Sequence, residues 1–141
     1  MAPHLGHVHL KVRDVERALE FYTGLFGLDV TERVGSYAFL TFGDHHHDIA
    51  LQGLGGDAPA AGPGVGLYHA AFELDDTDAL KELYHDLEER GVAASPVDHG
   101  ISKALYFDDP AGNGLEAYVD TRDTMDEDWE AMNRPFDPEA L

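Results

Sequence analysis

Hydrophobic and polar positions alternate along residues 4–12, HLGHVHLKV, as they do in a strand with one buried face. Apolar residues then follow helical spacing over residues 15–25, with Asp14 as the N-cap and Gly27 near the end of the helix. Three further strands are expected in the stretches LDVTERV, SYAFLTF and DIALQ. The first part of the chain therefore predicts the order strand, helix and three strands.

A linker without periodicity, GLGGDAPAAGPGVG, occupies residues 53–66. The pattern of the first part then begins again with the strand LYHAAFEL. A helix starts at Asp76 or Thr77, carries leucines at helical spacing and ends at Gly91. Three strands follow, ASPVDH, KALYF and GLEAYV, so the second part predicts the same order of elements.

The two parts align as an internal repeat. An offset of 62 residues pairs identical residues at three positions: His7 with His69, Asp14 with Asp76, and Tyr22 with Tyr84. An offset of 66 allows for a longer loop and pairs three further positions: Ala38 with Ala104, Leu40 with Tyr106, and Ala50 with Glu116. The predicted fold class is therefore α+β, with two tandem βαβββ modules.

The length of 141 residues suits one domain with a substantial core. We expect this domain at residues 1–120, with modules at about 5–53 and 66–119. The remaining residues, 121–141, form an acidic C-terminal tail in which Trp129 and Met132 are the obvious apolar anchors.

The chain is strongly acidic, with 28 Asp and Glu against 9 Lys and Arg and a formal net charge of -19. Such a surface repels nucleic acid and anionic membranes, so neither is expected as a partner. The even spread of acidic residues is typical of halophilic organisms that accumulate salt. The chain has no cysteine and no N-terminal signal pattern, so we expect a cytoplasmic protein without disulfides or thiolate metal sites.

The stretch with the most distinctive chemistry is residues 99–118, HGISKALYFDDPAGNGLEAY, which reads as a hairpin with Glu116 on its second strand. A carboxylate buried in a strand costs several kcal/mol unless a cation or hydrogen bonds meet it. The repeat brings His7 and His69 to equivalent first strands and sets Ala50 where the other module has Glu116. Two imidazoles, one carboxylate and open coordination positions are typical of a non-haem Fe(II) site.

Other assignments of the same residues are open at this point. His9 shares a strand face with His7 and could replace it as a ligand. Taken singly, His7 and His69 could be ordinary core or edge histidines. The donor set also suits Mn, Ni, Co or Zn, so Fe(II) is the first of several candidate metals.

The sequence resembles the vicinal oxygen chelate superfamily, the glyoxalase, bleomycin resistance and dioxygenase proteins, over about residues 5–120. The resemblance rests on LGHVHLKVRDVERALEFYTGLFGL, HHDIAL, LYHAAFELDD and the stretch at residues 99–118. The last of these is most similar to type I extradiol dioxygenases of the catechol 2,3-dioxygenase kind. Their best-known members have two such domains, and this chain matches the catalytic half. The resemblance implies a glyoxalase-like curved mixed sheet around a metal site.

The same resemblance implies roles for individual residues. The metal ligands would be His7, His69 and Glu116. His47 would lie near bound oxygen, in a run of three histidines that otherwise reads as a polar turn. The resemblance further implies that two residues of the hairpin hydrogen-bond the catechol and help to deprotonate it: His99 and Tyr106.

The function implied is Fe(II)-dependent ring cleavage of a catechol-type aromatic diol with O2, as in the catabolism of aromatic compounds. Other metal-dependent enzymes of the same fold are alternatives: a glyoxalase or other lyase, an epimerase, or a fosfomycin-type transferase. Glyoxalases and epimerases place a carboxylate or amide opposite the last Glu, where this chain has Ala50. A non-catalytic small-ligand-binding or resistance protein is the other class. Superfamily members often dimerise, so a homodimer is an expectation.

Overall fold

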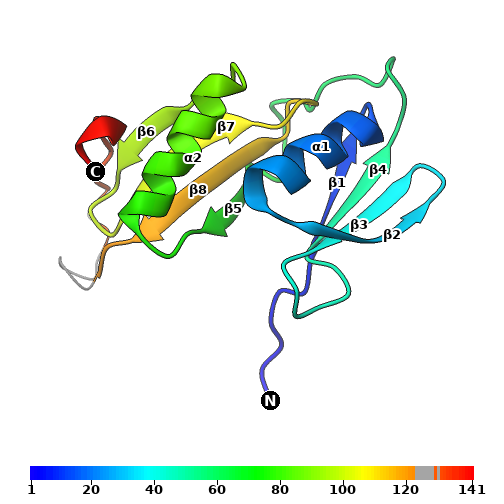
Figure 1. The fold of residues 1–141 in the computed structure, drawn as a ribbon, viewed down its shortest axis with the longest axis horizontal. Coiled ribbons are helices and arrows are strands. Elements are labelled where there is room, and N and C mark those ends of the chain that lie inside the picture. Colours follow the sequence, from blue (N-terminus) through cyan, green and yellow to red (C-terminus); the bar gives the residue numbers. More distant parts are fainter. Residues whose placement is uncertain (123–128, 130) are drawn as a thin grey trace. The chain divides into compact units, whose positions relative to one another are not determined.

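The computed structural model describes residues 1–122, 129 and 131–141, and the chain forms two compact units in it (Figure 1). Unit 1 comprises Met1–Val65 together with Asp109–Asn113. Unit 2 comprises Gly66–Asp108 and Gly114–Leu141. The part of the predicted acidic tail at residues 123–128 and 130 lies outside the described residues. No helix in the described part of the chain is long and apolar enough to cross a bilayer.

Unit 1 contains one helix and a four-stranded sheet with the order β1-β4-β3-β2, in which only β1 and β4 run parallel. Its elements, in chain order, are β1 (Val8–Val12), α1 (Val15–Phe26), β2 (Asp29–Val34), β3 (Tyr37–Thr41) and β4 (Ile49–Gly53). The side chain of Asp14 caps α1 by accepting from two backbone N–H groups of the first turn, and Gly27 ends the helix with φ 71°. The apolar stripe of α1 packs against β3 and β4.

The turn Asp109–Asn113 belongs to unit 1, where a buried hydrogen bond holds it to α1. The Tyr22 hydroxyl donates to Asp109 Oδ2 at 2.7 Å, and Tyr22 is fully buried. Asp109 Oδ1 accepts from the backbone N–H groups of Ala111 and Asn113 at 2.8 and 2.9 Å. The Asn113 amide donates to the Lys11 carbonyl at 2.8 Å. The motif DPAGN therefore uses its Asp as the buried centre of a turn.

Unit 2 repeats this arrangement and extends it by one strand, with the sheet order β5-β8-β7-β6-β9. Its elements, in chain order, are β5 (Ala70–Glu73), α2 (Thr77–Glu89), β6 (Ser95–Asp98), β7 (Ser102–Asp108), β8 (Gly114–Asp120), β9 (Arg134–Pro135) and the 3-10 helix η2 (Pro138–Ala140). Asp76 caps α2 by accepting from the Ala79 N–H at 2.8 Å. Leu80, Leu83 and Leu87 form the buried stripe of α2, which packs against β7 and β8.

The backbone ladders confirm the predicted tandem βαβββ modules. In unit 1 the parallel pair β1–β4 places His9 beside Ala50. In unit 2 the parallel pair β5–β8 places Ala71 beside Glu116. These pairs are related by the offsets of 62 and 66 residues that the sequence repeat uses. The same backbone position therefore carries a methyl group in unit 1 and a carboxylate in unit 2.

Two pairings of the repeat, Leu40 with Tyr106 and Ala38 with Ala104, are wrong by one residue. Tyr106 lies opposite Glu116 on β7–β8, and the residue that lies opposite Ala50 on β3–β4 is Phe39. Phe39, and not Leu40, is therefore the counterpart of Tyr106. The two hairpins have connections of different length, so the offset that aligns the last strands fails for the strands before them.

The C-terminal residues take regular structure in unit 2. β9 pairs with β6 through Val97–Pro135 and Asp98–Arg134, which adds an edge strand to the sheet. η2 packs against α2, and the Lys81 ammonium donates to the Glu139 carbonyl at 3.2 Å. Residues 134–141 thus extend the sheet and cover part of the helix of unit 2.

Candidate active site

His69 and Glu116 form the centre of the candidate site in unit 2. His69 directly precedes β5, and Glu116 lies on the neighbouring strand β8. Their closest side-chain atoms, His69 Nε2 and Glu116 Oε2, are 3.8 Å apart. The Glu116 side chain is only 12% exposed, and among the described residues no Lys or Arg forms an ion pair with it. A carboxylate this far from water requires another cation or hydrogen bonds.

This pair fits a divalent metal ion. Two ligand atoms at about 2.1 Å from one ion can be up to about 4.2 Å apart, so a separation of 3.8 Å is within reach of a shared ion. His69 Nδ1 is buried and is the one such side-chain nitrogen or oxygen in the described part of the chain that has no hydrogen-bond partner. An ion held by Nε2 would leave Nδ1 without a partner, so the fit to an ion rests on the spacing of His69 Nε2 and Glu116 Oε2 and on the shielded carboxylate.

Tyr106 and His99 lie beside this pair. The Tyr106 hydroxyl is 2.7 Å from His99 Nε2, and the rings of His69 and Tyr106 meet edge to face at 5.5 Å. Burial raises the pKa of Tyr106 well above its usual value, and the hydrogen bond and charge of Glu116 add to this shift. The phenol is therefore protonated at neutral pH. Unit 2 brings together four of the six predicted site residues: His69, His99, Tyr106 and Glu116.

The other two predicted residues, His7 and His47, lie together in unit 1. His7 directly precedes β1, as His69 precedes β5, and its ring centroid is 4.4 Å from that of His47. His47 also contacts the ring of Phe39 at 5.0 Å and His46 Nδ1 at 2.9 Å. Burial lowers the pKa of His47, and the charges of His7 and His46 lower it further. His47 is therefore neutral at physiological pH.

His9, the alternative ligand, differs from His7 in its surroundings. It lies within β1 and its ring meets the edge of Tyr37 at 6.0 Å, while His9 and His7 are both exposed. His7 lies before the strand and beside a second histidine. The repeat pairs His7 with His69, and it pairs His9 with Ala71.

A cavity of about 480 Å³ opens in unit 2 next to the candidate site. This volume suits a small organic molecule. Two residues of the candidate site, His69 and Tyr106, line this cavity. Other residues of its wall include Tyr68, Ala93, Phe107 and Gly114.

The sequence predicted only His69 and Tyr106 of this wall, and two of the residues it missed, Tyr68 and Gly114, approach each other closely. A Cβ atom at Gly114 would lie 2.5 Å from the Tyr68 carbonyl oxygen, so only glycine allows the two strands to approach this closely beside His69. The only sequence signal for Gly114 is its place directly after the turn residues DPAGN, where glycine is common whether or not another strand approaches.

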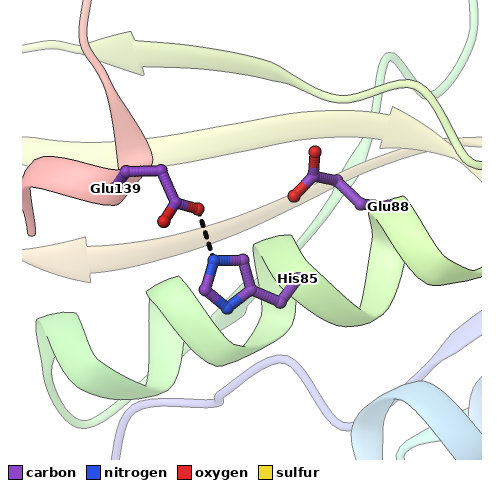
Figure 2. Close-up of side chains that lie close together, drawn as sticks. All are labelled: His85, Glu88 and Glu139. Atoms are coloured by element: carbon purple, nitrogen blue, oxygen red, sulfur yellow. Dashed lines mark hydrogen bonds and ion pairs between the residues drawn. The ribbon is translucent and has the colours of Figure 1, made fainter.

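A separate group of metal-ligand side chains lies on the surface of unit 2: His85, Glu88 and Glu139 (Figure 2). Their ligand atoms lie within 4.8 Å of one another. His85 hydrogen-bonds Glu139, which links α2 to η2. All three side chains are exposed, so water can meet their charges. We assign this group to the attachment of the C-terminal residues.

The chain belongs to the Glyoxalase/Bleomycin resistance protein/Dioxygenase superfamily, whose model matches residues 4–117. It is 31% identical over 135 residues to biphenyl-2,3-diol 1,2-dioxygenase 2 of Rhodococcus globerulus, covering 94% of this chain and 71% of that one. It is 36% identical to catechol-2,3-dioxygenase of Bacillus subtilis, covering 90% of this chain and 45% of that one.

Among solved structures, a glyoxylase/bleomycin resistance protein/dioxygenase domain from Frankia sp. EAN1pec has the same fold, with a TM-score of 0.71 and 23% identity. The match covers 85% of this chain and 99% of that one. Relatives at lower similarity are named as a glutathione transferase, a methylmalonyl-CoA epimerase and a lactoylglutathione lyase. Membership of the superfamily therefore establishes the fold and leaves the reaction to the residues of the site.

Proposed function

We propose that this protein is an Fe(II)-dependent extradiol dioxygenase that cleaves the ring of a catechol-type aromatic diol with O2. The observation that carries the proposal is the arrangement in unit 2. The ligand pair His69 and Glu116 lies beside the hydrogen-bonded pair Tyr106 and His99, and one member of each pair, His69 and Tyr106, lines a cavity of about 480 Å³. The similarity to proteins named as biphenyl-2,3-diol and catechol dioxygenases supports the same reaction.

In this proposal the metal ligands are His69, Glu116 and His7. The support for His7 is its place in the repeat, since His7 and His69 each directly precede the first strand of their unit. A ferrous ion held by two imidazoles and one carboxylate would supply open positions for a diol and O2 and the redox chemistry between them. The same donor set accepts Mn, Co, Ni or Zn, so the metal is identified by analysis and not by the ligands.

The residues around the ligands would handle protons. The Tyr106 hydroxyl, protonated at neutral pH, contacts His99 Nε2, and its oxygen can accept a hydrogen bond from an O–H group of the diol. His99 then offers an acceptor for a proton that leaves the diol. In unit 1, the neutral ring of His47 can hydrogen-bond an oxygen atom that gains negative charge during the reaction. Phe107 and Leu115 supply apolar wall to the cavity, which suits an aromatic ring.

Unit 1 provides an argument against the proton-shuttling reactions of the same fold. A glyoxalase or epimerase requires a carboxylate or amide opposite Glu116, and the equivalent position of β4 is Ala50. A non-catalytic binding protein has no need of the ligand pair in unit 2.

The first experiment is metal analysis of anaerobically prepared protein, with His69→Ala as the test variant and His85→Ala as the matched control. We expect about one iron per chain, lost in His69→Ala and retained in His85→Ala. Iron lost only in His85→Ala would place the metal in the surface group of Figure 2 and contradict the proposed site. Stoichiometric zinc or nickel would favour lyase, isomerase or transferase chemistry.

The second experiment measures oxygen uptake with monocyclic and bicyclic catechols, using iron-loaded protein at high salt. We expect one O2 consumed per diol and a ring-opened semialdehyde as the product. Glu116→Gln should abolish both iron binding and uptake. An iron-loaded protein that is silent with every diol would refute the reaction while leaving the metal site in place.

A further inference from the structure

The two ring nitrogens of His99 have different partners. Nδ1 lies 3.2 Å from the backbone carbonyl of Met132, and Nε2 lies 2.7 Å from the Tyr106 hydroxyl. A carbonyl oxygen only accepts, so the hydrogen bond to Met132 requires a proton on Nδ1. In the neutral ring Nε2 then carries the lone pair, and the Tyr106 hydroxyl must be the donor.

The pairing of β9 with β6 brings Met132 to this place. Asp98, the residue before His99, pairs with Arg134, and Met132 lies two residues before Arg134 on the approaching chain. Trp129 closes the same contact, because its indole N–H donates to the Met132 carbonyl at 3.2 Å and its ring meets His99 edge to face at 6.2 Å. The C-terminal segment thus contacts His99 on the side away from Tyr106.

The loop that carries His99 is also fixed on its other side. The His99 N–H donates to the Ser102 carbonyl at 2.9 Å, and the Thr121 hydroxyl donates to the Gly100 carbonyl at 2.6 Å. Gly100 is buried and has φ 81°, a conformation that favours glycine. The backbone at His99 is therefore held in place, and the Met132 carbonyl determines which ring nitrogen of His99 is protonated.

We propose that Trp129 and Met132 are positioning residues of the active site, which hold His99 in the Nδ1–H tautomer so that Nε2 accepts from Tyr106. The tautomer of His99 does not depend on the reaction, but its effect on catalysis rests on the proposed dioxygenase function. Glu116 is a competing acceptor for the same hydroxyl proton. Because His99 accepts this proton, the Tyr106 hydroxyl does not donate to Glu116. Both carboxylate oxygens then stay available to a metal ion.

The tautomer can be measured directly in the full-length, metal-free protein. Long-range proton–nitrogen correlation spectra of protein with 15N-labelled histidine distinguish Nδ1–H, Nε2–H and the doubly protonated ring, and His99→Gln assigns the signals. We expect a single Nδ1–H form for His99 at neutral pH. An Nε2–H form or a doubly protonated ring would overturn the proposal.

Two variants of Trp129 test the role of the segment. Trp129→Phe keeps an aromatic ring against His99 and should retain the single tautomer. Trp129→Ala removes both the ring and the indole donor, and it should give a mixture of tautomers. An unchanged tautomer in Trp129→Ala would overturn the role of Trp129. The wild-type spectrum decides the tautomer even where Trp129→Ala does not fold.

Kinetics separate this inference from the proposed function. In Trp129→Ala we expect kcat for ring cleavage to fall about tenfold with a nearly unchanged KM, because proton transfer loses its fixed acceptor. Trp129→Phe should restore kcat. The Nδ1–H form in a protein that cleaves no diol would refute the reaction and keep the tautomer assignment. Ring cleavage by a protein in which His99 has the Nε2–H form would support the reaction and refute the tautomer assignment.

Discussion

Tyr106 lies directly opposite Glu116 on the neighbouring strands β7 and β8. Residues opposed across an antiparallel pair point to the same face of the sheet, so the phenol and the carboxylate share one small volume. Glu116 contributes to the raised pKa of Tyr106, after burial. The proposed metal ligand and the proposed proton-transfer residue therefore lie on adjacent strands of one sheet, where loop motion has little effect on their spacing.

This relationship predicts that Tyr106→Phe separates catalysis from metal binding. The variant retains both His69 and Glu116, so we expect its iron content to equal that of the wild type. The hydroxyl is lost, and kcat for ring cleavage should fall by about 10²- to 10⁴-fold. Iron analysis and oxygen uptake on the same preparation test this. Loss of iron together with activity would show that Tyr106 supports the ligands instead.

Gly114 predicts a steric effect at the entry to the site. Gly114→Ala would place a methyl group 2.5 Å from the Tyr68 carbonyl oxygen, and backbone atoms can relieve this contact only by moving the strands apart. We expect the free energy of unfolding to fall by about 1–3 kcal/mol, and metal affinity to fall because His69 follows Tyr68. Denaturant unfolding and metal titration measure the two effects.

The matched control for this substitution is Gly56→Ala. Gly56 has open space around its Cβ position, and its backbone is outside the left-handed region. We expect no loss of stability there, and a small gain is consistent with the lower entropy of the unfolded chain. Equal effects of the two substitutions would contradict the argument from close approach.

Tyr22 predicts a loss of stability at alkaline pH. Burial raises its pKa well above the usual value of 10.0, and the charge and hydrogen bond of Asp109 raise it further. Above pH 10 the unfolded chain releases this proton and the folded chain retains it. The free energy of unfolding should therefore be constant with respect to this group below pH 10 and decrease as pH rises beyond it.

Tyr22→Phe tests the assignment. At neutral pH this variant leaves Asp109 without one of its buried donors, and we expect it to lose about 1–3 kcal/mol of stability. Its alkaline decline should be shallower than that of the wild type, since Phe has no proton to lose. Urea unfolding at several pH values from 7 upward gives both quantities. An identical alkaline slope in the two proteins would contradict the role of Tyr22.

The fold could be predicted because two signals agree along the chain. Periodicity located the elements, and the repeat fixed which strands are equivalent, so the offsets of 62 and 66 reappear in the parallel ladders. The counterpart of Tyr106 was missed by one residue because hairpin length decides the register of an antiparallel strand. The length of the connection in a hairpin cannot be predicted from the pattern of apolar residues.

The candidate site was predictable only in its polar residues. Glu116 is visible because a carboxylate on a strand needs a partner, and His69 because the repeat pairs it with His7. His99 and Tyr106 were identified through the resemblance to extradiol dioxygenases. Their supporting contacts depend on pairings between distant residues. The contact of Met132 with His99 requires β9, a two-residue strand too short for any periodicity. The contact of Tyr22 with Asp109 spans 87 residues and joins a helix to a turn.

The net charge of -19 predicts that salt stabilises this protein. Acidic residues outnumber basic ones by 28 to 9, so folding brings like charges together over most of the surface. The Debye length falls from about 10 Å at 0.1 M salt to about 3 Å at 1 M, which removes most of this repulsion. We therefore expect Tm to rise by several degrees between 0.1 M and 2 M KCl.

The control for screening is sucrose, which favours the compact state through exclusion from the surface and leaves the charges unscreened. KCl should raise Tm well above the value in sucrose at equal osmolality, and most of the gain should come below 1 M, where the Debye length changes most. A Tm that is flat with KCl, or that follows sucrose, would mean that repulsion among the acidic residues has no part in stability. In that case the acidic composition would serve solubility alone.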